Sequence, residues 1–148
     1  MGKGDMNFDR SSSQYLDGGA HTFNMASGGG FTAVTVVKFT GAAGMHERIF
    51  DFGNGIDENI ILRRLYDTTE LMFMIHNGAT MVCDIRKTNA ITQDAWITII
   101  SRYNAQNHSA ELMLNGLVVS SGTCSQPIVD RLLAKTYVGR ATGKQMNL

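Results

Sequence analysis

The stretch ELMLNGLVVSS, residues 111–121, decides the fold of this 148-residue chain. Leu112 and Leu114 lead into Asn115-Gly116, and Leu117 and Val119 leave it. Asn-Gly tolerates the positive φ angles of a two-residue type I′ turn, and the twist of that turn matches the twist of paired antiparallel strands. The stretch therefore predicts a β-hairpin.

The rest of the chain repeats this pattern of short strands and tight turns. Asn-Gly recurs at 54–55 and 77–78, and glycine occurs 16 times against a single proline. Runs rich in β-branched, aromatic and other apolar residues predict further strands; they cover residues 31–39, 47–52, 59–66, 70–76, 80–85, 95–103 and 135–139. Residues 130–135, DRLLAK, fit about one helical turn. Many short strands joined by turns predict an all-β, antiparallel two-sheet β-sandwich in a single domain.

Alternation also assigns side chains to the two faces of each strand. In the run 47–52, it places Arg48, Phe50 and Phe52 on one face and Ile49 and Asp51 on the other. Most of the nine methionines are expected in the core, together with Phe31, Phe39, Phe50, Phe52 and Phe73.

Composition and motif spacing exclude several classes of protein. Lys+Arg and Asp+Glu both number 13, and the basic residues are dispersed, which argues against nucleic-acid binding. No apolar run approaches the roughly 18 residues of a membrane span, so no membrane insertion is expected. Residues 28–30, Lys38 and residues 51–53 are similar to protein-kinase motifs, but the third loop glycine and the catalytic-loop motif are missing.

Two cysteines, Cys83 and Cys124, lie in or beside predicted strands. Neither has a second cysteine or histidine at zinc-ligand spacing. Two buried thiols and one disulfide bond both fit this pattern, and the sequence leaves both open.

Five stretches, taken in order, resemble the laminin-G-like jelly roll of the concanavalin A-like lectin/glucanase superfamily. They are NFDRSSSQYLDGG (7–19), GFTAVTVVKF (30–39), RIFDFGNG (48–55), AWITIISRYNAQNHSAELMLNGLVVSSG (95–122) and YVGRA (137–141). The resemblance implies two facing antiparallel sheets, with ligands bound at rim loops or on the concave sheet. It also implies that Trp96 lies in the core. Members of the superfamily serve as carbohydrate-binding modules, as adhesion domains and as surface modules of viral or cell-wall-associated proteins.

The resemblance also implies a strand that this sequence lacks. The family usually continues past the Gly-Arg pair, here Gly139-Arg140, with one more strand that pairs near the opening strand. Without it, a sandwich exposes an unpaired edge. We therefore expect residues 1–148 to be a fragment of a longer chain, with the missing edge strand supplied by the remainder of that chain or by a neighbouring subunit.

The glucanases of this superfamily need carboxylates that alternate along one strand, so that the acid and the nucleophile reach the same sugar. No such E-x-D-x-E pattern occurs, and Asp57 and Glu58 are adjacent. The sequence therefore argues against a catalytic role.

Hard oxygen ligands gather around residues 51–59. Asp51, Asn54 and Asp57, with Asp17 from the opening segment, offer a calcium site, because calcium takes about six to eight oxygens. The alternative is a polar turn in which the same residues bond to the backbone.

Tyr66 is the best candidate for an exposed ring that stacks on a sugar, because it ends a predicted strand close to Arg63. Asp57, Glu58 and Asn59 are the candidate partners for sugar hydroxyls. Asn107 begins an N-x-S triplet and would accept a glycan if the chain is secreted.

The sequence thus predicts a non-catalytic recognition module that binds glycans or mediates adhesion, carried at an extracellular, cell or virion surface. A structural module for protein–protein contact in a virion or an extracellular assembly is the alternative, and a glucanase-like hydrolase ranks third. The expected partner is a glycan or a protein surface.

Overall fold

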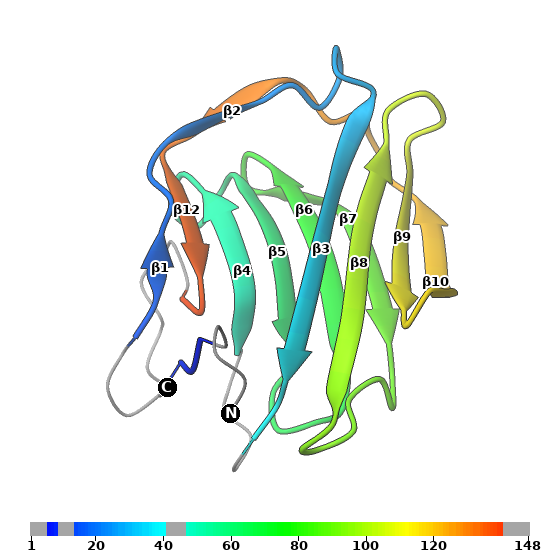
Figure 1. Cartoon of the computed structure of the whole chain (residues 1–148). Coiled ribbons are helices and arrows are strands. Elements are labelled where there is room, and N and C mark those ends of the chain that lie inside the picture. Colours follow the sequence, from blue (N-terminus) through cyan, green and yellow to red (C-terminus); the bar gives the residue numbers. More distant parts are fainter. Residues whose placement is uncertain (1–5, 9–13, 41–46, 141–148) are drawn as a thin grey trace.

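The computed structural model describes residues 6–8, 14–40 and 47–140, and it shows two stacked antiparallel sheets (Figure 1). The strands are β1 Leu16–Asp17, β2 His21–Phe23, β3 Gly30–Lys38, β4 Arg48–Gly53, β5 Asn59–Arg64, β6 Leu71–Asn77, β7 Thr80–Lys87, β8 Trp96–Asn104, β9 Ser109–Leu114, β10 Leu117–Thr123, β11 Arg131–Leu133 and β12 Lys135–Val138. The described ranges contain no helix. The predicted all-β sandwich is confirmed.

One sheet has six strands in the order β1-β12-β4-β5-β6-β7, and the other has four in the order β10-β9-β8-β3. A short ribbon of β2 and β11 crosses one end of the sandwich (Figure 1). The hairpin of residues 111–121 forms as predicted, with Leu117 opposite Leu114 and positive φ at Asn115 and Gly116.

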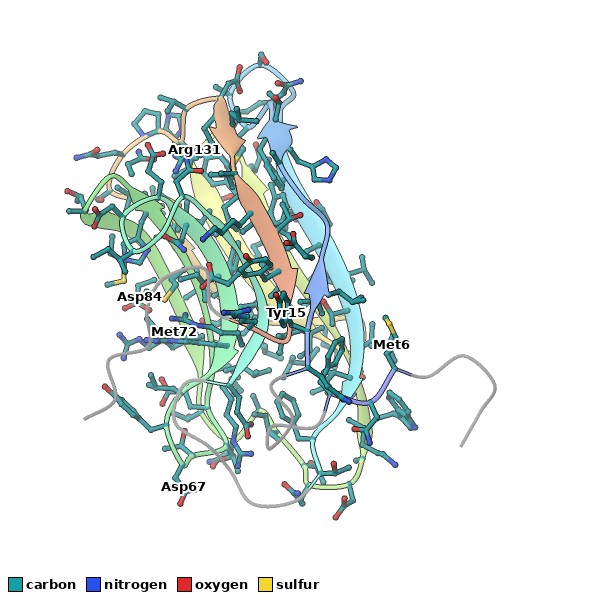
Figure 2. All side chains as sticks on the ribbon, turned by 90° about the vertical axis from the view of Figure 1, so that its left-hand side faces the viewer. Met6, Tyr15, Asp67, Met72, Asp84 and Arg131 are labelled. Carbon is teal, nitrogen blue, oxygen red and sulfur yellow. A yellow bond between two sulfur atoms is a disulfide. The ribbon has the colours of Figure 1, made fainter. Side chains whose placement is uncertain are left out.

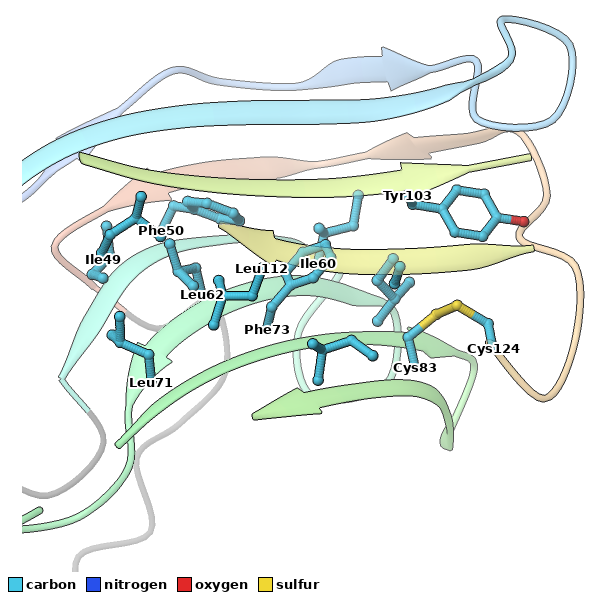
Figure 3. Close-up of a cluster of buried hydrophobic side chains, with 14 of the residues drawn as sticks. Ile49, Phe50, Ile60, Leu62, Leu71, Phe73, Cys83, Tyr103, Leu112 and Cys124 are labelled. Carbon is cyan, nitrogen blue, oxygen red and sulfur yellow. A yellow bond between two sulfur atoms is a disulfide. The ribbon is translucent and has the colours of Figure 1, made fainter. Parts of the chain in front are cut away.

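The core fills the space between the two sheets (Figure 3). Ile60, Leu62 and Phe73 enter it from the six-stranded sheet, and Tyr103 and Leu112 enter it from the four-stranded sheet. β8 and β9 bury alternate side chains, which is the pattern of a half-buried strand. β5 and β6 are buried on both faces, because Ile61, Met72 and Met74 pack in a second cluster on the outer side of the sheet.

Alternation fails at one decisive place, the start of β4. A bulge lies between Arg48 and Phe50, so that both Ile49 and Phe50 enter the core. An extra residue in one strand shifts the faces of everything on one side of it. Arg48 therefore lies opposite Arg63 on the outer face, and the prediction that it shares a face with Phe50 is wrong.

Two other predictions are also wrong. Residues 131–133 of the segment DRLLAK form β11, because Leu133 is buried and the segment pairs with β2. Trp96 is 53% exposed, because the buried positions of β8 are Ile97, Ile99 and the alternate residues that follow. The large aromatic core residue of this strand is Tyr103, which is 2% exposed.

Cys83 and Cys124 form a disulfide bond. Cys83 lies on β7 and Cys124 directly follows β10, and these two strands are the edges of their sheets on the same side of the sandwich. The bond therefore joins the two sheets along one side, where Figure 3 shows it beside the core.

Candidate functional site

The outer face of the six-stranded sheet carries a cluster of charged and sulfur-containing side chains that we call the arginine face. One row across β4–β7 is Arg48, Arg63, Met72 and Arg86. The next row is Asp51, Ile61, Met74 and Asp84. Met72 and Asp84 mark this side of the sheet in Figure 2. Because neighbouring strands lie about 4.8 Å apart, the residues of a row are direct neighbours.

Apolar packing fixes the middle of this face. Ile61, Met72 and Met74 are buried and form a second cluster with Leu65, separate from the core between the sheets. Arg63 Nη2 donates to Met72 Sδ at 3.3 Å. The arginine side chains are thus held against a rigid sheet, which is the kind of support that a precise binding site needs.

Arg48 is the most desolvated cation of the arginine face. Its Nε lies 3.7 Å from Oδ2 of Asp51, and the two side chains are 16% and 1% exposed. Within the described residues, Arg48 Nε and Nη1 have no hydrogen-bond partner. Burial lowers the pKa of Arg48, and the carboxylate of Asp51 opposes this shift. Buried guanidinium hydrogens without partners are costly, so this position favours an additional acceptor.

The pKa of Arg63 is affected by neighbouring cations as well as by burial. Burial, and after it the charge of Arg48, lowers the pKa of Arg63 to about 10, while Tyr66 opposes the shift. Repulsion between neighbouring cations is relieved when an anion lies between them. The two arginines therefore form a local excess of positive charge in a chain whose formal net charge is zero.

His76, on the neighbouring β6, borders the same group. Burial lowers the pKa of His76, and Arg48 and Arg63 lower it further. Its Nδ1 has no hydrogen-bond partner among the residues that the structure describes. His76 is therefore a neutral imidazole at neutral pH, next to two cations.

Tyr66 stands at the open margin of the arginine face. Its ring is 50% exposed, and its φ of 50° turns the chain sharply after β5. Tyr66 interacts electrostatically with both Arg63 and Arg86. Arg86 is held by Asp84 through two contacts of 2.7 Å. The structure thus brings together Tyr66 and Arg63, which sequence analysis singled out, and adds Arg48, Arg86 and His76, which it missed.

The other candidate ligand-binding residues, Asp57, Glu58 and Asn59, lie at the opposite end of β5 from Tyr66, so the structure does not bring them to its ring. Asn59 is buried and donates from Nδ2 to Asp51 Oδ1 at 2.7 Å. Glu58 Oε2 accepts from Asn54 Nδ2 at 2.8 Å. Asp57 is exposed and interacts electrostatically with His76.

The four calcium candidates are distributed along this same margin. Asp17 lies two strands from Asp51, with Tyr137 between them, and Asp17 Oδ1 accepts from the Gly19 amide at 2.8 Å. Asn54 Nδ2 also donates to the Leu132 carbonyl. Within the described ranges, no group of three His, Cys, Asp or Glu side chains is placed to hold a metal ion. Calcium binding stays a prediction.

Asn107 lies exposed in the turn between β8 and β9, at the end of the sandwich. Its Oδ1 accepts from the backbone amide and the hydroxyl of Ser109, at 3.1 and 2.7 Å. The acceptor nitrogen thus belongs to an accessible turn, and glycosylation at Asn107 stays a prediction.

No protein-family model and no curated sequence matches the chain, but several solved structures do. A carbohydrate-binding module, the CBM40 of the Ruminococcus gnavus IT-sialidase, superposes with a TM-score of 0.62 at 14% identity, covering 76% of this chain and 64% of that one. Domains LG4-5 of the mouse laminin α1 chain give 0.57 at 13%, covering 86% and 33%. A Bacillus licheniformis β-glucanase gives 0.55 at 14%, covering 80% and 55%. The fold is the concanavalin A-like jelly roll.

This concanavalin A-like jelly roll confirms the architecture that the sequence motifs implied. At these identities the likeness concerns the fold, which hosts both binding modules and a hydrolase. The chain spans less than two thirds of the length of each of these structures.

Proposed function

We propose that this chain is a non-catalytic carbohydrate-binding module that holds an acidic saccharide on the arginine face. The observation that carries the proposal is Arg48, a desolvated guanidinium whose Nε and Nη1 lack hydrogen-bond partners in the described part of the chain. A second guanidinium, Arg63, lies directly opposite on the next strand.

Arginine suits this role because its planar guanidinium bonds a carboxylate through two parallel hydrogen bonds. A sugar carboxylate between Arg48 and Arg63 would accept hydrogen bonds from both. It would also offset the repulsion that lowers the pKa of Arg63. Such charge-assisted bonds are stronger when the donors are already partly desolvated.

The exposed ring of Tyr66 supplies the second element of sugar recognition. Aromatic rings pack against the apolar C–H faces of sugars while polar neighbours bond the hydroxyl groups. Arg86 and Asp84 flank this ring side of the arginine face, and Asp84 is an exposed acceptor for hydroxyls there. Asp57, at the opposite end of β5, is a further exposed acceptor.

The structural comparisons support a glycan ligand. The CBM40 structures to which this chain is similar include complexes described as bound to α2,3- and α2,6-sialyllactose. Those ligands carry a carboxylated sugar, which is the chemistry that the arginine face would accept.

The placement of carboxylates on the arginine face favours binding over hydrolysis. Asp51 and Asp84 lie three strand spacings apart, roughly 14 Å. Retaining and inverting glycosidases hold their two carboxyl groups within about 5 to 9.5 Å of each other. Their backbones are thus farther apart than such a pair of carboxyl groups, and Asp51 is bonded to Asn59 while Asp84 is bonded to Arg86.

We further propose that the module works in an oxidising, extracellular or surface environment. The disulfide between Cys83 and Cys124 supports this location, because such bonds persist outside the reducing cytosol. The described residues include no helix that could span a membrane.

Calorimetric titration with α2,3-sialyllactose and with lactose tests the proposal. We expect binding of the sialylated sugar and little binding of lactose. Arg63→Gln should weaken binding about 10- to 100-fold, because it removes charge-assisted hydrogen bonds. Arg102→Gln is the matched control, since Arg102 is an exposed, ion-paired arginine on the four-stranded sheet. Equal affinity for both sugars, or equal loss in both variants, would refute the proposal.

Repeating the titration with a chelator tests whether binding requires calcium. If Asp17, Asp51, Asn54 and Asp57 assemble a calcium-assisted site, added EDTA should abolish binding and added calcium should restore it. Unchanged affinity in EDTA would remove calcium from the proposal.

A structural role in protein–protein contact is the second candidate function. It is favoured by the exposed apolar residues on the four-stranded sheet, which are Val34, Val36, Trp96, Leu117 and Val118. Glycan titrations that stay silent for every sugar, together with self-association of the chain, would favour this role.

A further inference from the structure

A stack of one arginine and two tyrosines lies beside the C-terminal end of β12. The Cζ atom of Arg140 is 4.4 Å from the ring centre of Tyr15 and 5.6 Å from that of Tyr137. The two rings meet edge to face, with centres 5.2 Å apart. In Figure 2, Tyr15 lies at nearly the same height as Met72 of the arginine face. We call Arg140 and the two tyrosines the arginine–tyrosine stack.

The arginine–tyrosine stack lies on the same side of the six-stranded sheet as the arginine face. Tyr137 pairs with Asp51 of the arginine face, and the next residue, Val138, packs against the core between the sheets. Because successive side chains of a strand point to opposite sides, Tyr137 points outward. Tyr15 contacts the Tyr137 ring and precedes Leu16, which pairs with Val138. The outer face thus carries a second group of aromatic and cationic side chains, at β12 and beside β1.

The backbone register brings this stack next to the first strand of the arginine face. The Gly139 amide donates to the Ile49 carbonyl at 3.1 Å, so the end of β12 lies beside the start of β4, where Arg48 is. Arg140 follows Gly139 directly and extends the row of Arg48 and Arg63 by one strand. Because neighbouring strands lie about 4.8 Å apart, the backbones of Arg140 and Arg63 are roughly 10 Å apart.

Stacking leaves the hydrogen-bonding edge of Arg140 accessible. A cation–π contact uses the flat face of the guanidinium, whereas the N–H donors point outward in its plane. Arg140 is exposed, and no carboxylate in the described part of the chain forms an ion pair with it. The two rings also restrict the side chain, so less conformational freedom is lost when an anion binds. The arginine–tyrosine stack is therefore suited to bind an anion.

Exposed tyrosine rings stand at both ends of this row of arginines. Tyr15 is 38% exposed and Tyr66 is 50% exposed. One carboxylated sugar held by Arg48 and Arg63 would leave the arginine–tyrosine stack uncovered, because the stack lies one to two strand spacings away. A second acidic group on a neighbouring sugar would reach the stack.

We infer that the ligand of this face is an acidic oligosaccharide with carboxylates on successive sugars, lying across the strands. One carboxylate is bound between Arg48 and Arg63, as in the proposed function on which this inference rests. A second carboxylate accepts hydrogen bonds from the edge of Arg140. Tyr15 is a positioning residue, because its ring holds the guanidinium of Arg140 in place.

Calorimetric titration with two ligands tests the inference. A trimer of sialic acid carries a carboxylate on every sugar, whereas α2,3-sialyllactose carries one. The trimer should bind the wild type roughly tenfold more tightly, because it gains a charge-assisted contact at Arg140. Arg140→Gln should remove this gain and leave the affinity for sialyllactose unchanged. Arg63→Gln should weaken both ligands, and Arg102→Gln, the control on the four-stranded sheet, should weaken neither.

Two variants of Tyr15 test its positioning role. Tyr15→Phe keeps a ring against Arg140 and should bind the trimer like the wild type. Tyr15→Ala removes the ring and should weaken binding of the trimer but not of sialyllactose. In a chain that already carries Arg140→Gln, Tyr15→Ala should cause no further loss, because Tyr15 acts through the guanidinium. Losses that simply add in the double variant would refute this role.

The two ligands separate failure of this inference from failure of the proposed function. If sialyllactose binds but the trimer binds no more tightly, or if Arg140→Gln binds the trimer like the wild type, the inference is overturned and the proposed function stands. Equal weakening of both ligands by Arg140→Gln would also overturn it, because Arg140 would then belong to the first carboxylate position. If neither ligand binds, both proposals fail. Far-UV circular dichroism and melting temperatures check that every variant is folded.

Discussion

Replacing both cysteines, with Cys83→Ala and Cys124→Ala together, should lower the free energy of unfolding by about 4 kcal/mol. The two residues are 41 positions apart. For a closed loop of this length, the chain-entropy relation gives roughly 13 cal/mol/K, which is about 4 kcal/mol at room temperature. Both cysteines are buried, so the loss of their sulfur atoms adds a smaller packing cost of the same sign.

The assay is guanidinium-induced unfolding followed by far-UV circular dichroism. The variant should unfold at a lower denaturant concentration, and reductant should shift the wild type most of the way to that midpoint, because the reduced protein keeps its sulfur atoms, without affecting the variant. If the wild type and the variant unfold at the same midpoint without reductant, the two sheets are not covalently joined. A difference below about 1 kcal/mol with the bond present would refute the entropic argument.

Two further predictions concern buried polar groups. Tyr103→Phe should cost about 1–3 kcal/mol in thermal unfolding, because the buried Ile128 amide loses its 3.0 Å acceptor; an unchanged melting temperature would show that this bond contributes nothing. The pKa of His76 is lowered by burial and by Arg48 and Arg63, so the unfolded chain binds the proton more readily. Stability should therefore fall as the pH drops below about 6.5, and His76→Gln should reduce this dependence in urea titrations; an identical pH profile in both proteins would contradict it.

The sequence predicts most of the fold because most strands pair with the strand that precedes or follows them in the chain. The Asn115-Gly116 turn and the alternation around it define a hairpin whose partner strands are adjacent in the chain. β11 is different, because three residues in DRLLAK become a strand only through pairing with β2, more than a hundred positions away. No local pattern carries that information.

The candidate site is only partly visible in the sequence. Tyr66 and Arg63 stand out because they are close together in the chain. Arg48 is hidden, because a one-residue bulge moves it to the outer face, and simple alternation assigns it to the wrong side. Arg86 joins the site only through the register of β5, β6 and β7, which depends on the whole sheet.

The exposed position of Trp96 has a spectroscopic consequence. It is the single tryptophan of the chain, and its indole lies on the outside of the four-stranded sheet with Lys38 Nζ 5.6 Å from the ring centre. We expect its emission in the native protein to be close to that of a solvated indole, so that denaturation changes it little. Intrinsic tryptophan fluorescence therefore reports on the outer face of the four-stranded sheet and not on ligand binding at the six-stranded sheet. Fluorescence studies of the six-stranded sheet need an extrinsic dye.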